Sequence, residues 1–180
     1  LQKAAVIGRQ FQLAVFRELA KADEAIDTWL AQLERGGLLR PDRAPEVDYV
    51  FPDTLVYEVA YNSILVKHRR EFHLSTARTL ETLYADKIEQ HCDLLADHFH
   101  RSDDDESAIK YLEMAAKRAK NEYANLTAIK RYKELLQHKE KLGDLAGQAN
   151  ALYQIGVIAY EIGDYEQAKE ALERAVPLYE

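Results

Sequence analysis

The chain has 180 residues, with 24 Lys and Arg against 31 Asp and Glu, and this net charge of −7 argues against general nucleic-acid binding. One Cys excludes an intramolecular disulfide framework and a Cys-rich zinc site, and no apolar run approaches the ~20 residues of a membrane helix. The N-terminus has no signal-peptide pattern and no initiator Met, so we expect a cytoplasmic segment of a longer protein.

The first third predicts three short helices. Residues 1–7 form an apolar stretch that ends at Gly8. Asp23 is placed to cap the third helix, which ends at the pair Gly36-Gly37. The apolar positions assigned to the second helix are Phe11, Val15, Phe16 and Leu19, and those assigned to the third are Ile26, Trp29, Leu30 and Leu33.

Two short extended runs follow, at residues 38–40 and 48–51, and the turn between them contains Pro41, Asp42 and Pro45. They are predicted to pair as a two-stranded hairpin. Asp53 then caps a helix that begins at Thr54. Three helices followed by a two-stranded wing is the plan of a winged helix, which we assign to residues 1–62.

A winged helix often binds DNA, and that interpretation competes with a structural spacer. The recognition helix would span about residues 23–35, and its outward positions are acidic on balance, which repels phosphates. Those outward positions are Glu24, Asp27, Thr28, Gln32, Glu34 and Arg35. The wing offers Arg40 and Arg43, but also Asp42, Glu46 and Asp48.

The clearest repeat lies near the end of the chain, in residues 149–180. Gly163-Asp164-Tyr165 forms a turn between two helices whose small and large apolar residues alternate as in a tetratricopeptide repeat. Small residues allow antiparallel helices to approach closely. The first-helix positions are Leu152, Ile155 and Gly156, and the second-helix positions are Ala168, Leu172 and Ala175.

A weaker copy lies earlier in the chain, with a longer second helix that ends at Gly143. Its matching positions are Leu112, Ala115 and Ala116, then Ala128, Tyr132 and Leu135. Each residue of the earlier copy precedes the equivalent residue of the later repeat by the same number of positions, as Leu112 precedes Leu152. We call this separation the repeat offset.

We therefore expect a mainly α fold, in which the winged helix leads through a connecting helix at 63–87 into an α-α superhelix of TPR-like repeats at 88–180. Repeats of this kind need neighbours to bury their faces. No polar capping helix ends the array, so we expect further repeats beyond Glu180 in the parent protein.

The stretch from residue 51 to 81 resembles a known family. The matching residues are Phe51, Leu55, Glu58-Val59-Ala60-Tyr61, Leu65, Arg69-Arg70, His73, Ala77 and Leu80-Glu81. Residues 4–11 and 33–39 match as well. The pattern resembles the region after the nucleotide-binding core in STAND-type signal-transduction ATPases, including cyclase-associated and maltose-activator-like regulators. At Asp53 the family usually has a His associated with sensing the nucleotide state, so that role does not carry over.

The resemblance implies a segment that couples a TPR sensor to an ATPase domain preceding Leu1. The chain contains no Gly-x-x-x-x-Gly-Lys-Ser/Thr phosphate loop. We therefore expect no catalytic activity and no cofactor. The expected partners are a protein or peptide in the TPR groove and the ATPase domain of the parent protein. The competing function is a DNA-binding winged helix of a transcription regulator with a TPR dimerisation arm; a small enzyme of unfamiliar type is the third.

Other chemical patterns are better explained structurally. His91, Cys92, His98 and His100 cluster, but no third metal ligand shares the face of His91 and His98. Residues 102–106 read as an acidic helix start rather than a calcium loop. The sequon at Asn125 is idle in a cytosolic protein. Glu58, Tyr61 and His73 lie along helices without a nucleophile at a strained turn.

The first helix of each TPR pair lines the concave face of the superhelix, and these helices are predicted at about residues 105–122 and 145–162. Lys supplies a charged donor, Asn can clamp a peptide backbone, and Tyr has an apolar ring with a polar tip. Such a set suits an extended acidic peptide or a terminal carboxylate; the alternative is a solvated surface. The inward-facing candidates are Lys110, Lys117, Lys120, Asn150, Tyr153 and Tyr160.

Overall fold

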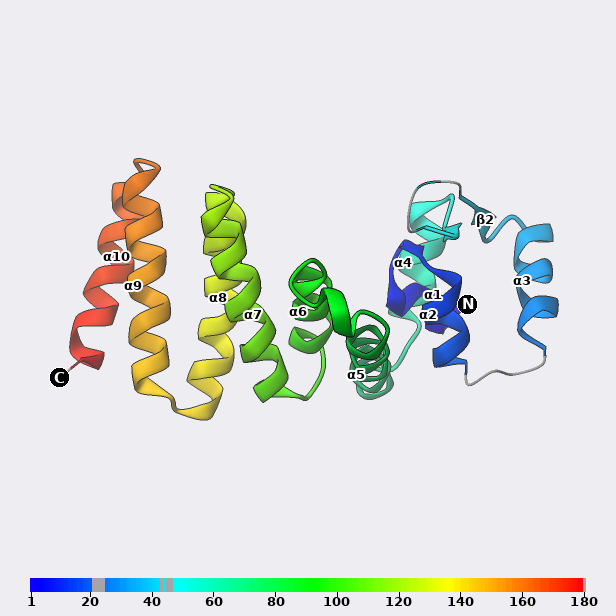
Figure 1. The fold of residues 1–180 in the computed structure, drawn as a ribbon, viewed down its shortest axis with the longest axis horizontal. Helices are drawn as coiled ribbons and strands as arrows, with labels where there is room; N and C mark the ends of the chain where they lie inside the picture. Colours follow the sequence, from blue (N-terminus) through cyan, green and yellow to red (C-terminus); the bar gives the residue numbers. More distant parts are fainter. Residues whose placement is uncertain (21–24, 43, 45–46, 180) are drawn as a thin grey trace. The chain divides into compact units, whose positions relative to one another are not determined.

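The computed structural model describes residues 1–20, 25–42, 44 and 47–179. The expected cap at Asp23 and the positions Glu24, Arg43, Pro45 and Glu46 lie outside this set. The chain divides into two compact units, one formed by residues 1–86 with 101–103 and the other by residues 87–100 with 104–180. Helices dominate both units (Figure 1). Within the described residues, no helix is long and apolar enough to cross a membrane.

The first unit contains five described helices and a small antiparallel sheet. Strand β3 lies between β1 and β2, and it pairs Val50 with both Gln10 and Arg40. The predicted pairing of two extended runs is therefore confirmed, but the sheet has a third strand. The elements are α1 (Gln2–Ile7), β1 (Gln10–Phe11), α2 (Leu13–Leu19), α3 (Ile26–Arg35), β2 (Arg40–Pro41), β3 (Tyr49–Val50), α4 (Thr54–Asn62) and α5 (Val66–Leu83).

Two helical assignments in this unit are wrong. Phe11 belongs to β1 rather than to the second helix, because its backbone pairs with Tyr49 and the helix begins only at Leu13. The ring still joins the core, with its centroid 5.7 Å from that of Phe16. Trp29 has the spacing of the buried stripe of α3, yet it is 44% exposed. The buried residues of that helix are Ile26 and Leu30.

Helices α4 and α5 complete the first unit. The predicted cap at Asp53 is confirmed, since its carboxylate accepts a hydrogen bond of 2.7 Å from the Leu55 amide. Helix α5, the predicted connecting helix, packs against α1 and α2 within the first unit. His73 on α5 is buried and lies 2.8 Å from the hydroxyl of Tyr61 on α4. This pair joins two helices and is a structural contact.

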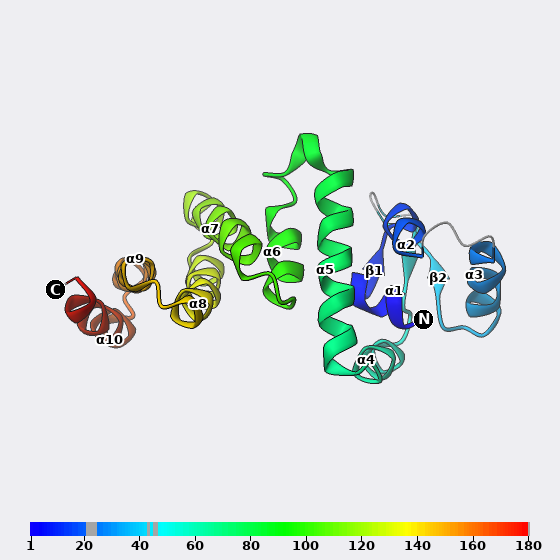
Figure 2. The same cartoon turned by 90° about the horizontal axis from the view of Figure 1, so that it is seen from below.

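The second unit is a series of antiparallel helices. After η1 (Ala85–Lys87), which spans the boundary, the helices are α6 (Cys92–His100), α7 (Asp105–Asn121), α8 (Asn125–Leu142), α9 (Leu145–Glu161), α10 (Tyr165–Ala175) and the short η2 (Val176–Leu178). Each helix from α6 to α10 packs on the next. Figure 2 shows α9 and α10 nearly end-on beside each other. Helices α9 and α10 begin one repeat offset after α7 and α8, so the predicted spacing is confirmed.

Small residues make the close crossing between α9 and α10. A Cβ placed on Gly156 would lie 2.7 Å from Cγ of Leu172 and 3.3 Å from the carbonyl oxygen of Ala168. Ala168 and Ala175 are buried on the facing side of α10. The close approach of Gly156 to Ala168, expected from the repeat pattern, is therefore confirmed.

Candidate peptide-binding groove

Equivalent caps set the positions of the two helices that form the groove. The carboxylate of Asp104 accepts a 3.0 Å hydrogen bond from the Ser107 amide at the start of α7, and Asp144 accepts one of 2.9 Å from the Gly147 amide at the start of α9. The expected acidic start of α7 is thereby confirmed. Because the two caps are separated by the repeat offset, Lys110 and Asn150 occupy equivalent positions on their helices.

A cavity of about 400 Å³ lies between α7 and α9, over α8. Its lining combines charged and amide side chains with a few apolar ones. The lining residues are Glu113, Lys117, Lys120, Asn121, Tyr132, Leu135, Gly147, Asn150, Ala151 and Gln154. Both amide and ammonium donors therefore meet at one hollow, over a floor that is partly apolar.

The structure brings together three of the six expected groove residues. Lys117, Lys120 and Asn150 line the cavity. Lys110 lies outside it, with its ammonium nitrogen 3.1 Å from the Tyr111 hydroxyl and over the Tyr111 ring. A separation of ten residues is about 15 Å along a helix, which is too far for Lys110 and Lys120 to line one small hollow.

The two expected groove tyrosines also lie outside the cavity lining. Tyr153 is 48% exposed and Tyr160 is 65% exposed. The ring of Tyr160 packs edge-on against that of Tyr165, with the centroids 5.5 Å apart. The Tyr160 ring, in the last turn of α9, therefore packs against the start of α10 and does not line the hollow.

The charges around the cavity leave its Lys117 side positive. Lys120 donates a 2.9 Å hydrogen bond to the side-chain oxygen of Gln154, which links α7 to α9 and holds the ammonium group at the rim. Lys117 forms no ion pair with any residue that the structure describes. Glu113, the acidic group of the lining, lies 3.6 Å from Lys139. An acidic ligand would therefore meet two ammonium groups and one carboxylate, Glu113, which shares the Lys139 ammonium group with Asp144.

The floor of the groove is supported by a Lys139–Asp144 ion pair of 2.9 Å. Burial opposes the charged form of Lys139, but its hydrogen bond to Asp144 and the charge of Glu113 outweigh burial and raise its pKa. The hydrogen bonds from Lys139 and from the Gly147 amide lower the pKa of Asp144. A Cβ at Gly147 would collide with both side chains, so the glycine makes room for this pair.

Sequence reasoning missed Glu113, Asn121 and Gln154. Helical spacing holds the signal that identifies them, because residues four apart share a face. Gln154 follows Asn150 by four residues, and Lys117 lies four residues from both Glu113 and Asn121. Counting in steps of four from Lys117 and Asn150 would have selected Glu113, Asn121 and Gln154 rather than Tyr153.

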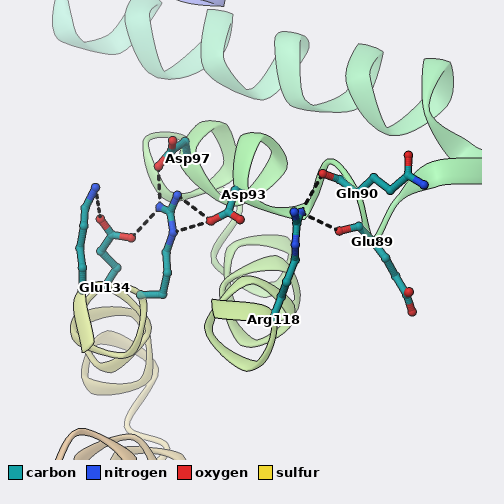
Figure 3. A network of polar contacts seen from close by, with 8 residues as sticks. Glu89, Gln90, Asp93, Asp97, Arg118 and Glu134 are labelled. Carbon is teal, nitrogen blue, oxygen red and sulfur yellow. Dashed lines mark hydrogen bonds and ion pairs between the residues drawn. The ribbon is translucent and has the colours of Figure 1, made fainter. Parts of the chain in front are cut away.

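Helices α6 and α8 are fastened together behind the groove by a buried arginine. The guanidinium of Arg131 lies 3.0 Å from Asp93, 2.6 Å from Asp97 and 3.0 Å from Glu134, as Figure 3 shows. Burial opposes its charge, but the hydrogen bond to Asp97 and the nearby carboxylates raise the pKa of Arg131 above its ordinary value. Arg131 is only 5% exposed, so this network fixes the spacing of the two helices.

Helix α7 is fastened to the segment before α6 in a similar way. The guanidinium of Arg118 donates to the carbonyl oxygens of Glu89 and Gln90 at 3.3 and 2.9 Å, and Figure 3 shows these contacts. It also pairs with Glu122 at 2.9 Å. Arg131 thus holds α8 against α6, and Arg118 holds α7 against the segment that precedes α6.

One histidine of the predicted cluster, His100, forms a structural contact with α8. His100 lies 2.9 Å from His138, whose other ring nitrogen lies 2.8 Å from Asp105. Burial alone would raise the pKa of Asp105, but hydrogen bonds from Lys141 and His138 hold it below its usual value. Cys92 is buried. Among the residues described, no group of three or more His, Cys, Asp or Glu is arranged to hold a metal ion.

The comparisons identify one part of the chain. Residues 125–180 match the family model of the tetratricopeptide repeat. The match spans α8 to α10, and α7 is tied to it by the repeat offset and the equivalent cap. No curated protein and no solved structure matches the chain. The helical array therefore contains TPR repeats, which indicates a protein-interaction module.

Proposed function

We propose that the chain is a non-catalytic regulatory segment that binds an extended acidic peptide or terminal carboxylate in the groove between α7 and α9. The observation that carries the proposal is the cavity that gathers Lys117, Lys120 and Asn150 within a TPR array. Ammonium groups pair with carboxylates, and the Asn amide can bond to a peptide backbone.

The test is binding of a library of acidic peptides to the purified chain. The double variant Lys117→Ala with Lys120→Ala should lose affinity by about a hundredfold or more, because each charge-assisted hydrogen bond contributes about 1.5–3 kcal/mol and about 1.4 kcal/mol is tenfold. Lys110→Ala removes a Lys on the same helix that lies outside the cavity, so it is the matched control and should bind like the wild type. Equal binding by all three proteins would reject the groove.

We further propose that this segment belongs to a STAND-type ATPase and couples its peptide-binding repeats to a nucleotide-binding domain. Part of the resemblance lies in the core of the first unit, where Phe51, Ala77 and Leu80 are buried, whereas the matching residues Leu55, Val59 and Leu65 are exposed. The three-stranded sheet with its β2–β3 hairpin also suits a winged helix. The coding sequence ahead of Leu1 provides the test. A phosphate loop is expected in that sequence, and its absence would contradict the proposal that the segment belongs to an ATPase.

The charge of the first unit opposes the DNA-binding alternative. The Tyr49 hydroxyl donates a 2.8 Å hydrogen bond to Glu34 on α3. Burial, this hydrogen bond and the charges of Glu34, Asp27 and Asp48 raise the pKa of Tyr49 to about 12. Glu34 and Asp48 therefore lie close enough to Tyr49 to act on its hydroxyl, and carboxylates near the hairpin disfavour phosphates there. A gel shift with random duplex DNA is expected to show no salt-sensitive complex.

A further inference from the structure

An unusual backbone conformation marks the turn between α7 and α8. Tyr123 has a φ of +58° and is the only non-glycine residue with positive φ among those the structure describes. A Cβ is disfavoured in this left-handed region, and a bulky residue there is a clear outlier. The ring of Tyr123 is 86% exposed, so no burial offsets the strain.

Equivalent turns in the same array use glycine at this position. In the α7–α8 turn the amides of Tyr123 and Ala124 donate to the carbonyls of Lys120 and Ala119. The α9–α10 turn has the same two hydrogen bonds at the equivalent positions, with Gly163 at φ +81°. The same pattern recurs at Gly143, φ +70°. The fold therefore accepts glycine here, and Tyr123 is not required by the turn.

Exposed apolar side chains also lie at the other turn on the same edge of the array. Figure 1 places the α7–α8 and α9–α10 turns at the same end of the helices, opposite the α8–α9 turn. We call this surface the tip edge, and it consists of Tyr123, Leu126, Tyr160, Ile162 and Tyr165, which are 86, 77, 65, 41 and 65% exposed. Clustered exposed apolar residues commonly mark interaction sites, and backbone strain is concentrated at such sites.

The charges of the tip edge define its partner. The segments 121–127 and 160–166 contain no Lys or Arg. They carry four carboxylates, of which Glu122 is paired with Arg118. The others are Glu161, Asp164 and Glu166. A partner surface that complements the tip edge would combine apolar side chains with cationic ones. The cations could pair with the carboxylates or lie over the faces of the tyrosine rings.

We propose that the tip edge binds a basic amphipathic segment of a partner protein, with Arg or Lys side chains flanking an apolar face. This surface is separate from the acidic-peptide groove, because none of its five residues lines that cavity. Two occupants compete with this one. An anionic membrane would be repelled by the carboxylates, and a second copy placed edge to edge would bring like charges together.

The probe is a pair of synthetic amphipathic helices that share one apolar face and carry either Arg or Glu along its flanks. Binding of each peptide to the chain is measured by fluorescence anisotropy at low and high salt. The Arg peptide is expected to bind about tenfold or more tightly than the Glu peptide, and salt should weaken it. Equal binding of the two peptides overturns the proposal.

Variants of Tyr123 separate binding from folding. Tyr123→Gly should keep or raise the thermal midpoint, since glycine is unstrained in this turn, and should weaken the Arg peptide about tenfold. Tyr123→Asn tolerates the same backbone without the ring and should behave alike. Tyr179→Ser is the matched control, because Tyr179 is 64% exposed but lies beyond the opposite end of α10.

Three outcomes would overturn the proposal. The first is unchanged affinity in Tyr123→Gly, and the second is an equal loss in Tyr179→Ser. The third is sedimentation showing that the chain self-associates and that Tyr123→Gly abolishes it, which would make a second copy the occupant. The double variant Lys117→Ala with Lys120→Ala should bind the Arg peptide with the affinity of the wild type. A failure of the groove proposal can therefore be distinguished from a failure of the tip-edge proposal.

Discussion

The crossing of α9 and α10 allows a quantitative test of the repeat packing at Gly156. Gly156→Ala adds one methyl group that would lie 2.7 and 2.8 Å from Cγ and Cδ2 of Leu172. Both distances are well below ordinary carbon–carbon contact. Leu172 is 36% exposed, so its side chain can move outward only by giving up part of its packing.

Two effects of opposite sign decide the magnitude. Overpacking costs about 1–3 kcal/mol, whereas replacing Gly by Ala inside a helix gains about 1 kcal/mol. The free energy of unfolding should therefore fall by about 0–2 kcal/mol in Gly156→Ala, and by more in Gly156→Leu. In a Leu172→Ala background the clash with the leucine is gone and the 3.3 Å contact with the Ala168 carbonyl oxygen remains, so Gly156→Ala should be neutral or stabilise by up to about 1 kcal/mol.

Urea unfolding followed by circular dichroism measures the four corners of this cycle. The expected coupling between the two positions is about 1–3 kcal/mol. Gly163→Ala serves as the control, because its Cβ would meet open space and its cost comes from the φ of +81° alone. Leu172→Ala should not rescue it. A coupling energy near zero for Gly156 and Leu172 would refute the helix register described above.

Three further predictions concern charges and caps. Arg131→Leu leaves Asp93, Asp97 and Glu134 facing one another without a cation, and should cost about 3 kcal/mol of stability by urea unfolding; Lys169→Ala, on an exposed pair, should change it by under about 1 kcal/mol. The folded-state pKa of Asp105 is lowered, so its stabilisation is complete above its unfolded pKa and is lost as the pH falls below about 4. Thermal midpoints of Asp105→Asn should therefore fall less steeply on acidification than those of the wild type, and a parallel curve would contradict this. Asp53→Ala should cost about 1 kcal/mol by removing the cap of α4, and Asp53→Asn should restore most of it.

The repeat architecture could be predicted because it depends on local spacing. The acidic helix start at Asp104 and the small residue Gly156 act through residues close to them in the sequence, the first by capping α7 and the second by allowing the close crossing of α9 and α10. The sequence pattern therefore identified the helices α7 to α10 and the repeat offset between the pairs.

Features that depend on contacts between distant residues could not be predicted. Phe11 has the spacing of a helix face, but its strand pairing is decided by Tyr49, which lies beyond two intervening helices in the sequence. The groove shows the same limit. Asn150 and Tyr160 share a helix, yet only neighbouring helices determine which of them faces the hollow, and Tyr160 is drawn to Tyr165 across the turn.

The most direct test of the central claim is to map where an acidic peptide binds. The peptide selected from the library is titrated into isotopically labelled chain, and the amide chemical shifts are followed by NMR. The account predicts that the largest changes cluster in residues 113–121 and 147–154, on the two helices that line the cavity. Changes centred on the first unit or on the tip edge, with these two segments unperturbed, would contradict it.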